Sequence, residues 1–388
     1  MKKEIILLMK FIPAPAYSGG AKRNLSWLKF LSKHYKVNLI GFFDKKYNDT
    51  KISELKKYTI NIYGFTFKRN IIKNSLKSFV FNKSLINLQY YNKDIKKTLT
   101  NLLNNNNISF IMCEELAMMK YCMNVNVPVY FDDHNIEYIL MNRTANYNSF
   151  PLNLFLKREA KLIQKEELKS FNRAEKIFVV SDTDKRQIDN TYNDKTIVVN
   201  NCYEILKKTS QQNLKKSIVF VGNVSWKPNL HGIKHFIQNI FPKALQKDNN
   251  ITLHIIGSNI PNQIKNIISP NIKLHENASE KLKNQIIDES IICIVPVYFG
   301  SGTRIKILEY WSHYKPVIST TIGAEGLIKS TGTYICDDDD QFAGQIINLI
   351  NDEDRIKKMG EENHKVFIEN YCEEIVYGDT LYNTINTK

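Results

Sequence analysis

The chain has 388 residues, with 43% hydrophobic and 24% charged residues and a formal net charge of +15 at pH 7. This composition is typical of a soluble globular protein, and the length is enough for two domains of ordinary size. No apolar run approaches the roughly 18 residues that would span a bilayer, which excludes a membrane-spanning chain.

The N-terminal segment predicts a strand rather than an export signal, because Glu4 and Lys10 enclose only the apolar run 5–9. The cysteines are scattered and form no CxxC pair, so neither a disulfide framework nor a zinc site is predicted. They are Cys113, Cys122, Cys202, Cys293, Cys336 and Cys372. Thiols of this kind indicate a reducing compartment, and we expect the protein to be cytoplasmic.

Short apolar runs alternate with segments of helical periodicity along the whole chain. Strands are expected at 4–9, 37–42, 59–65, 108–113, 127–132, 176–181, 196–200, 217–222, 251–257, 272–275, 291–297, 316–320 and 333–336. Helices are expected at 20–34, 88–104, 152–173, 229–247, 280–289, 303–314 and 340–350. This alternation predicts an α/β fold of doubly wound parallel sheets, which bind ligands beyond the carboxyl ends of their strands.

The first strand runs into the glycine turn Gly19-Gly20 and then into a helix, a place where backbone closely approaches a ligand. The turn does not follow the pattern GxGxxG, so NAD or FAD is not indicated. His134 follows the strand ending in Asp132-Asp133. It could bond a sugar hydroxyl or leaving group, or it could cap the helix near Ile136. The adjacent aspartates point to opposite faces of a strand, which argues against a metal there.

Residues 56–100 carry ten Lys and Arg against Asp94 alone, a charge of +9 with aromatic residues between them. Such a stretch suits an anionic membrane surface, and the alternative is a solvated lysine-rich face. No nucleic-acid-binding pattern accompanies it, so nucleic acid is not expected as a partner.

The polar stretch 205–213 separates the two series of strands and predicts a linker. We expect a first domain at 1–204, a linker at 205–216, a second domain at 217–365 and a C-terminal helix at 366–388. The four aspartates 337–340 predict a solvated helix N-terminus rather than a metal cluster.

The segment 300–309 joins an apolar strand to a helix, and we expect Thr303 to cap that helix. Arg304 and Lys306 then lie in a first turn that favours acids, so an anion such as a nucleotide diphosphate is the predicted partner. In the alternative interpretation both side chains point into water and Lys306 pairs with Glu309.

Three segments of the second half resemble family 4 retaining glycosyltransferases. They are 219–236 with its Trp226-Lys227-Pro228-Asn229, 295–309, and 315–327 with its Gly323-Ala324-Glu325-Gly326. The first-half loops around Gly19 and Asp133-His134-Asn135 also match. The resemblance implies a GT-B fold, with two Rossmann-like domains facing across a cleft and a final helix that crosses back to the first domain.

The resemblance also implies roles for individual residues. Arg304, Lys306 and His134 would be catalytic, the first two neutralising the leaving diphosphate and His134 contacting the donor sugar. Glu309 would accept hydrogen bonds from the ribose. The remaining donor-binding positions are Gly19, Gly20, Asn223, Lys227, Gly300, Ser301, Gly302, Thr303, Gly323, Ala324, Glu325 and Gly326. No metal or other cofactor is implied beyond the nucleotide-diphosphate sugar itself, with UDP or GDP as its nucleotide.

Two positions depart from the family pattern. Ser301 stands where many relatives have an acidic residue, and Asn223 stands where many have an arginine, with Lys227 only near the place of their lysine. With Ser301 in place of the acidic residue, the sugar-contacting role of that acid has no obvious holder.

The sequence therefore predicts a retaining, hexosyltransferase-type enzyme. Its acceptor is expected to be a cell-surface glycan or a lipid-linked acceptor. The enzyme is expected in the cytoplasm and peripherally on the inner face of the cytoplasmic membrane. Two alternatives stay open: a nucleotide-sugar 2-epimerase of the same fold, and a non-catalytic membrane- or nucleic-acid-binding protein with a decayed site.

Overall fold

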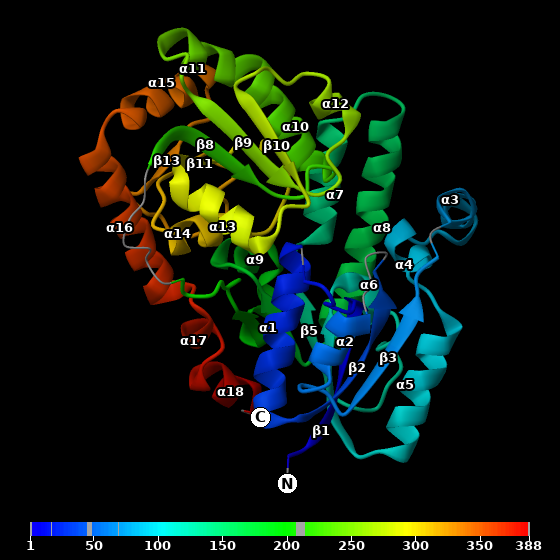
Figure 1. Ribbon diagram of the computed structural model, residues 1–388. Helices are drawn as coiled ribbons and strands as arrows, with labels where there is room; N and C mark the ends of the chain where they lie inside the picture. The colour runs from blue at the N-terminus through cyan, green and yellow to red at the C-terminus, as the bar shows by residue number, and fades with distance from the viewer. Residues whose placement is uncertain (1, 17, 45–48, 69, 207–213, 387–388) are drawn as a thin grey trace. The chain divides into compact units, whose positions relative to one another are not determined.

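The structure is a computed structural model that describes residues 2–16, 18–44, 49–68, 70–206 and 214–386. The chain forms two compact units, Met1–Asn200 and Asn201–Lys388. Each unit is a parallel sheet covered by helices (Figure 1). Among the described residues, no helix is both long and apolar enough to cross a membrane.

The first unit has a seven-stranded sheet in the order β3-β2-β1-β4-β5-β6-β7. Its strands are β1 (Glu4–Phe11), β2 (Lys36–Phe43), β3 (Asn61–Thr66), β4 (Ile108–Glu114), β5 (Val129–Asp133), β6 (Lys176–Val179) and β7 (Thr196–Val198). Its helices are α1 (Gly19–His34), α2 (Asp49–Leu55), α3 (Ile71–Phe81), α4 (Leu85–Gln89), α5 (Lys93–Asn105), α6 (Leu116–Met119), α7 (Glu137–Asn146), α8 (Leu152–Arg173), α9 (Asp182–Gln187) and the 3₁₀ helix η1 (Asn190–Lys195).

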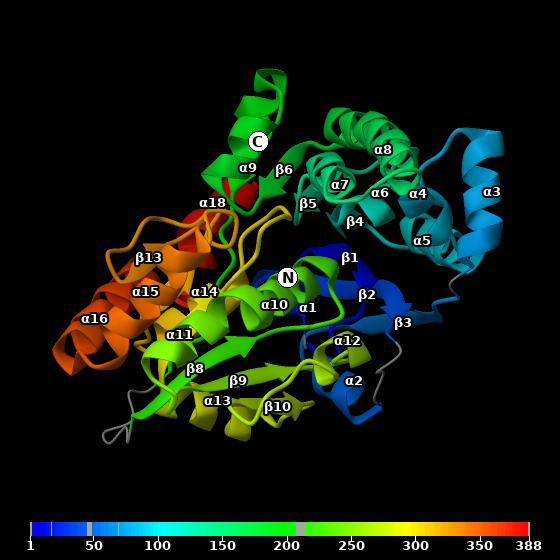
Figure 2. The same cartoon turned by 90° about the horizontal axis from the view of Figure 1, so that it is seen from above.

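Alternate residues of these strands pack on opposite faces of the sheet. Ile6 and Leu8 of β1 belong to a core that α5, α6 and α8 complete, whereas Trp27 of α1 packs on Phe178 from the other face at 5.1 Å between ring centroids. Figure 2 shows α1 and α2 on one side of the sheet and α5, α6 and α8 on the other. Burial on both faces explains why the strands are nearly continuous apolar runs.

The second unit has a six-stranded sheet in the order β10-β9-β8-β11-β12-β13. Its strands are β8 (Lys215–Val221), β9 (Thr252–Gly257), β10 (Ile272–Glu276), β11 (Ser290–Val295), β12 (Val317–Ser319) and β13 (Thr333–Ile335). Its helices are α10 (Lys227–His235), the π-helix η2 (Phe236–Ile240), α11 (Phe241–Lys247), α12 (Asn262–Lys265), α13 (Glu280–Glu289), α14 (Ile305–Ser312), α15 (Asp339–Ile350), α16 (Glu353–Asn370), α17 (Glu373–Val376) and α18 (Asp379–Asn386).

The two faces of this second sheet bury separate clusters. Phe220 of β8 packs with α10, α11 and α15, whereas Val219 packs with α13, α14 and α16. The period of two along the strand thus places α14, with its Tyr310 and Trp311, against the face of the sheet that carries Val219.

All thirteen predicted strands are present, and two predicted helices are broken. The helix expected at 88–104 is interrupted because the Tyr121 hydroxyl accepts from Asn92 N at 2.6 Å and donates to Tyr90 O at 2.7 Å. The helix expected at 229–247 contains the π-turn η2 directly before Pro242, which lacks the N–H that a continuous α-helix requires. The aspartates 337–340 lead into α15, which Asp338 caps.

Part of the predicted linker 205–216 falls on residues 207–213, which lie outside the described residues, and β8 already begins at Lys215. The units divide between Asn200 and Asn201. The residues after this point are bound to the second unit, because Asn201 Nδ2 donates to Thr303 Oγ1 and Tyr203 N donates to Tyr371 O at 3.1 Å.

Candidate functional site

The chain order of the second sheet reverses between β8 and β11, so the loops that follow these strands and β12 leave the same edge side by side. These loops hold the donor-binding positions that the sequence predicts for this unit. The topological switch point therefore brings 222–227, 300–306 and 323–326 into one region.

The turn from β11 to α14 needs its glycines. Gly302 has φ +72° and Gly300 has φ +141°, backbone conformations that side-chain-bearing residues rarely adopt. The prediction that Thr303 caps the helix is wrong, since α14 begins at Ile305 with Arg304 at the cap position and no side-chain cap bond. The Thr303 hydroxyl instead accepts from Asn201 Nδ2 at 2.5 Å. The first N–H groups of α14 consequently carry no side-chain cap.

Arg304 is buried and holds this turn together. Its Nη1 donates to Ser301 O at 2.5 Å and to Gly302 O, and its guanidinium lies 5.5 Å from the ring centre of Trp226. A side-chain atom added at Gly300 would come within 2.6 Å of Arg304 Nη2. The interpretation in which Arg304 points into water is therefore wrong: its cation is fixed beneath the glycine turn.

Lys306 reaches across to the loop after β8. Its ammonium donates to Asn229 Oδ1 at 3.0 Å and lies 4.0 Å from the ring centre of Phe220. A side-chain atom at Gly222 would come within 2.8 Å of the same ammonium. Burial and the neighbouring Arg304 charge lower the pKa of Lys306 to about 7. An anion bound here would favour the protonated form of Lys306 and raise this pKa.

Glu309 does not pair with Lys306, which was the alternative that the sequence offered. Its carboxylate accepts from the Tyr203 hydroxyl at 2.8 Å and lies 2.5 Å from the Lys283 ammonium. Although burial opposes the charged form of Lys283, this carboxylate raises its pKa. Neither Tyr203 nor Lys283 was predicted, because both come from segments remote in sequence that carry no motif.

The turn after β12 is packed closely against the sheet. A side chain at Gly323 would collide with Ser319 Oγ at 2.3 Å and Val295 O at 2.5 Å, and Gly326 has φ +80°. Ala324 N donates to Thr320 O at 3.1 Å, and Glu325 N donates to Ile322 O at 3.4 Å.

Asn223 and Lys227 are the most exposed of the predicted positions in this region. Asn223 Oδ1 accepts from Ser225 N at 3.1 Å, and its carbonyl accepts from Asn229 Nδ2 at 2.9 Å. Asn229, which the sequence analysis did not single out, thus connects the loop after β8 with Lys306. Its only sequence signal was its place in the run Trp226-Lys227-Pro228-Asn229.

In the first unit the corresponding switch point lies between β1 and β4. Gly19 and Gly20 begin α1, and the Ser18 hydroxyl accepts from Ala21 N at 3.2 Å. His134 lies beside them: a side-chain atom added at Gly20 would be 3.5 Å from His134 Nδ1. The structure therefore brings these three predicted residues together.

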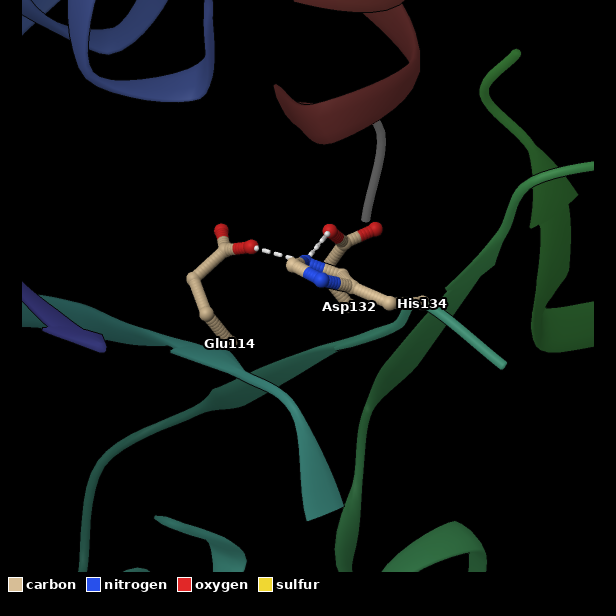
Figure 3. Close-up of side chains that lie close together, drawn as sticks. All are labelled: Glu114, Asp132 and His134. Atoms are coloured by element: carbon tan, nitrogen blue, oxygen red, sulfur yellow. Dashed lines mark hydrogen bonds and ion pairs between the residues drawn. The ribbon is translucent and has the colours of Figure 1, made fainter. Parts of the chain in front are cut away.

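His134 is held by two buried carboxylates (Figure 3). Its Nε2 lies 2.9 Å from Glu114 Oε2 and 3.0 Å from Asp132 Oδ2. Although burial opposes the charged ring, these carboxylates raise the pKa of His134 to about 9. The imidazole is therefore doubly protonated at neutral pH, and Nδ1–H is directed toward the start of α1. The helix that follows His134 has no side-chain cap, so the alternative capping role is wrong.

Asp132 keeps its charge because Arg23 binds it. Arg23 Nε donates to Asp132 Oδ2 at 2.7 Å, Nη2 donates to Oδ1, and the guanidinium holds the pKa of the carboxyl below its usual range against the effect of burial. Glu114 was not predicted, although it is a polar residue at the carboxyl end of an apolar strand, and burial together with Asp132 raises its pKa.

Glu114, Asp132 and His134 have potential ligand atoms within 4.8 Å of one another, as in a metal site. Two features make this trio a poor ligand set. The one ring nitrogen that would bind a metal donates to both carboxylates, and the Arg23 cation occupies Asp132. The three residues form a charged hydrogen-bond network, and the His134 Nδ1–H is the donor that none of the three uses.

Residues 215–352 match the family model described as glycosyl transferases group 1. A protein of Klebsiella pneumoniae, described as an uncharacterized 44.6 kDa protein in the cps region, is 24% identical over 391 residues, which cover 96% of this chain and 98% of that protein.

Solved structures with the same overall fold include TarM, with a TM-score of 0.69 at 13% identity over 100% of this chain and 99% of TarM. Sucrose-phosphate synthase from Thermosynechococcus elongatus has a TM-score of 0.70 at 11% identity, with 99% of each chain covered. HepE of Anabaena, in complex with UDP and glucose, has a TM-score of 0.68 at 11% identity over 99% of this chain and all of HepE. These likenesses confirm the predicted GT-B fold.

Proposed function

Because residues 215–352 form a group 1 glycosyl transferase domain within a GT-B fold, we propose that the protein transfers a sugar, with retention, from a nucleotide-diphosphate sugar. The observation that supports this most is the turn from β11 to α14. There an uncapped helix start, the fixed Arg304 cation and the Lys306 ammonium meet at the switch point of the second sheet.

The donor diphosphate is proposed to bind at this turn. The N–H groups at the start of α14 would donate to the phosphate oxygens, and Lys306 would pair with the charge that develops as the nucleotide leaves. Arg304 has its Nη1 occupied by the carbonyls of Ser301 and Gly302. Its proposed role is therefore to hold the turn and to add positive potential beneath it.

Glu309 is proposed to accept from the ribose hydroxyls. Tyr203 and Lys283 donate to its carboxylate and thereby fix its orientation and charge. We propose UDP as the first nucleotide to test, because HepE was crystallised with UDP and glucose and TarM of S. aureus with UDP and alpha-GlcNAc-glycerol.

His134 is proposed to donate from Nδ1 to the donor sugar or to its leaving phosphate. Retention would follow from front-face attack, in which the leaving phosphate takes the proton of the acceptor hydroxyl. Donation from Nδ1 needs an imidazolium rather than a neutral histidine, because Nε2 already faces two carboxylates. Glu114 and Asp132 stabilise this charged ring.

The acceptor is proposed to be a cell-surface glycan or its lipid-linked precursor, with the enzyme on the cytoplasmic side of the membrane. Support comes from the relative of Klebsiella pneumoniae, which is described by its place in the cps region. The basic residues of 56–100 support contact with an anionic membrane surface.

The test is thermal unfolding with a panel of UDP-, GDP- and ADP-sugars, with Lys306→Ala as the site variant. We expect one donor to raise the midpoint of the wild type and to have little effect on the variant. If no donor raises the unfolding midpoint of the wild type, the glycosyltransferase proposal is wrong and the non-catalytic alternative is favoured.

Product analysis with the active donor and no acceptor separates the two enzyme alternatives. Intact donor or slow hydrolysis agrees with transfer. Accumulation of an epimerised sugar would instead identify a 2-epimerase.

A further inference from the structure

We propose that a basic cavity of the first unit binds the phosphate head group of an anionic membrane lipid, whose acyl chains lie against the apolar face of α3. The proposal extends the function above by giving the membrane contact a defined head-group site. It does not require the donor site, because all the residues concerned belong to the first unit.

The cavity has a volume of about 570 Å³ and lies between α5 and α8, beneath the segment 81–91. Five lysines line it: Lys83, Lys96, Lys120, Lys165 and Lys169. The one acidic side chain among the described lining residues is Glu166, and its carboxylate accepts from the N–H and hydroxyl of Ser84 at the start of α4. The lining therefore has an excess of positive charge that suits an anion.

Lys120 is the most enclosed of these lysines. Its ammonium donates to the carbonyls of Ile86 and Asn87, and burial lowers its pKa to about 7. The Glu166 carboxylate opposes this shift, and the like charge of Lys83 adds to it. A phosphate in the cavity would favour the protonated amine, as expected for a site that is completed by an anion.

The face of α3 next to this cavity is apolar and exposed. Its large side chains include Ile72 at 78% exposure, Val80 at 75% and Leu76 at 66%, with Ile71, Phe79 and Phe81 also exposed. Figures 1 and 2 show α3 projecting from the edge of the first unit beyond α4. Such a continuous apolar face is a mark of an interaction surface rather than of an ordinary solvated helix.

Contacts connect this face with the cavity and with the start of α8. Phe81 lines the cavity, and Phe79 packs on Phe155 of α8 at 6.0 Å between ring centroids. Leu152 and Leu154 on the same helix are exposed as well. A smaller cavity of about 200 Å³ under Asn74 and Lys77 of α3 shares lining residues with the larger one.

An anionic bilayer is the occupant that fits both the basic cavity and the apolar face of α3. The apolar face gains from burial in the acyl region, and the lysines gain from the negative surface of the leaflet. Free phosphate would fill the cavity and leave α3 exposed. A second copy of this basic unit would bring like charges together.

Flotation with vesicles tests the proposal, using phosphatidylcholine alone and an equimolar mixture with phosphatidylglycerol. The cavity variant is Lys165→Gln/Lys169→Gln, and its matched control is Lys357→Gln/Lys358→Gln, two exposed lysines of α16. The apolar variant is Ile72→Gln/Val80→Gln, with the exposed Ile375→Gln of α17 as its control.

We expect the wild type to bind the mixed vesicles and the cavity variant to bind them about 30-fold more weakly, from about a fivefold loss for each of the two lysines near a charged surface. The apolar variant should lose binding to the mixed vesicles. Both controls should bind as the wild type does. All four variants should keep the nucleotide-induced thermal shift, so that failure of the donor site is read separately.

Three outcomes would overturn the proposal. Equal loss in the cavity variant and its lysine control would show that net charge alone drives binding. A thermal shift with inorganic phosphate alone, without vesicle binding, would identify free phosphate as the ligand. A wild-type dimer in light scattering that the apolar variant abolishes, again without vesicle binding, would make α3 a subunit interface.

Discussion

At the scale of single residues, each unit's candidate site contains a basic group with a shifted pKa, and the two shifts have opposite directions. Burial and Arg304 lower the pKa of Lys306 to about 7, whereas two carboxylates raise the pKa of His134 to about 9. Each shift depends on burial and on charged side chains that the fold holds beside the group. Each gives a pH dependence that a single substitution removes.

Nucleotide affinity should be constant below pH 7 and should fall above it, because Lys306 of the free protein then loses the proton that the diphosphate requires. Lys306→Arg should abolish this dependence, since a guanidinium stays charged over the whole range. Isothermal titration at several pH values measures both, and a wild-type affinity that is flat up to pH 9 would remove Lys306 from the diphosphate site.

Lys306→Ala should in addition lower kcat/KM by about 10²–10³. Lys357→Ala is the matched control, because Lys357 is an exposed lysine of α16 in the same unit and is not a predicted donor-binding position. A comparable loss in both variants would indicate a general effect of charge.

Glu114→Gln should move the alkaline limb of kcat/KM, expected near pH 9 in the wild type, to lower pH. The variant keeps an acceptor for His134 but removes the carboxyl whose hydrogen bond helps to raise the pKa of the ring. The pH profile is the measurement, with the exposed Glu175→Gln as control. A limb that stays in place would show that Glu114 does not position a catalytic proton.

At the scale of elements, α14 is tied to the strand beside it. Tyr310 is buried on α14, and its hydroxyl accepts from Val221 N at 2.7 Å, directly before Gly222. This bond fixes the loop after β8 against the helix that carries Lys306. The packing of α14 therefore also determines the geometry of the proposed anion site.

Tyr310→Phe should lower the free energy of unfolding by about 1 kcal/mol, because the partly buried Val221 N–H loses its acceptor. It should also weaken nucleotide binding, since Gly222 and Lys306 lose their common support. Urea unfolding and titration measure the two effects, and Tyr63→Phe on β3 is the control for removal of a tyrosine hydroxyl. Unchanged stability would show that the bond contributes nothing net.

At the scale of the whole molecule, the chain is two sheets with separate cores. Apart from the contact proposed for His134, the proposed diphosphate and ribose contacts belong to the second unit. Ligand binding should therefore stabilise that unit directly, by an amount set by mass action.

Trp27→Phe leaves Trp226 and Trp311 as fluorescence reporters of the second unit alone. In this variant a nucleotide at 100 times its Kd should stabilise the reported transition by about 2.7 kcal/mol. Circular dichroism, which follows both units, should show a second transition that does not move. A single transition that shifts as a whole would mean that the two units unfold cooperatively.

The sequence by itself determined the strands, the α/β class and the position of the glycine turns. Apolar runs bounded by turn residues are local signals, and a parallel sheet buried on both faces needs little else. It also placed His134 and Lys306 at carboxyl ends of strands, where ligands bind.

Only the tertiary structure decided what those side chains do. Thr303 was expected to cap the helix, but its hydroxyl accepts from Asn201 instead. Arg304 was expected to neutralise the leaving diphosphate, and the structure shows that its guanidinium also donates to the carbonyls of the turn. Glu114, Tyr203 and Lys283 carry no motif and reach their partners only through the topology of the sheets. Charge states depend on burial and on which side chains the fold brings into contact, and a linear pattern shows neither.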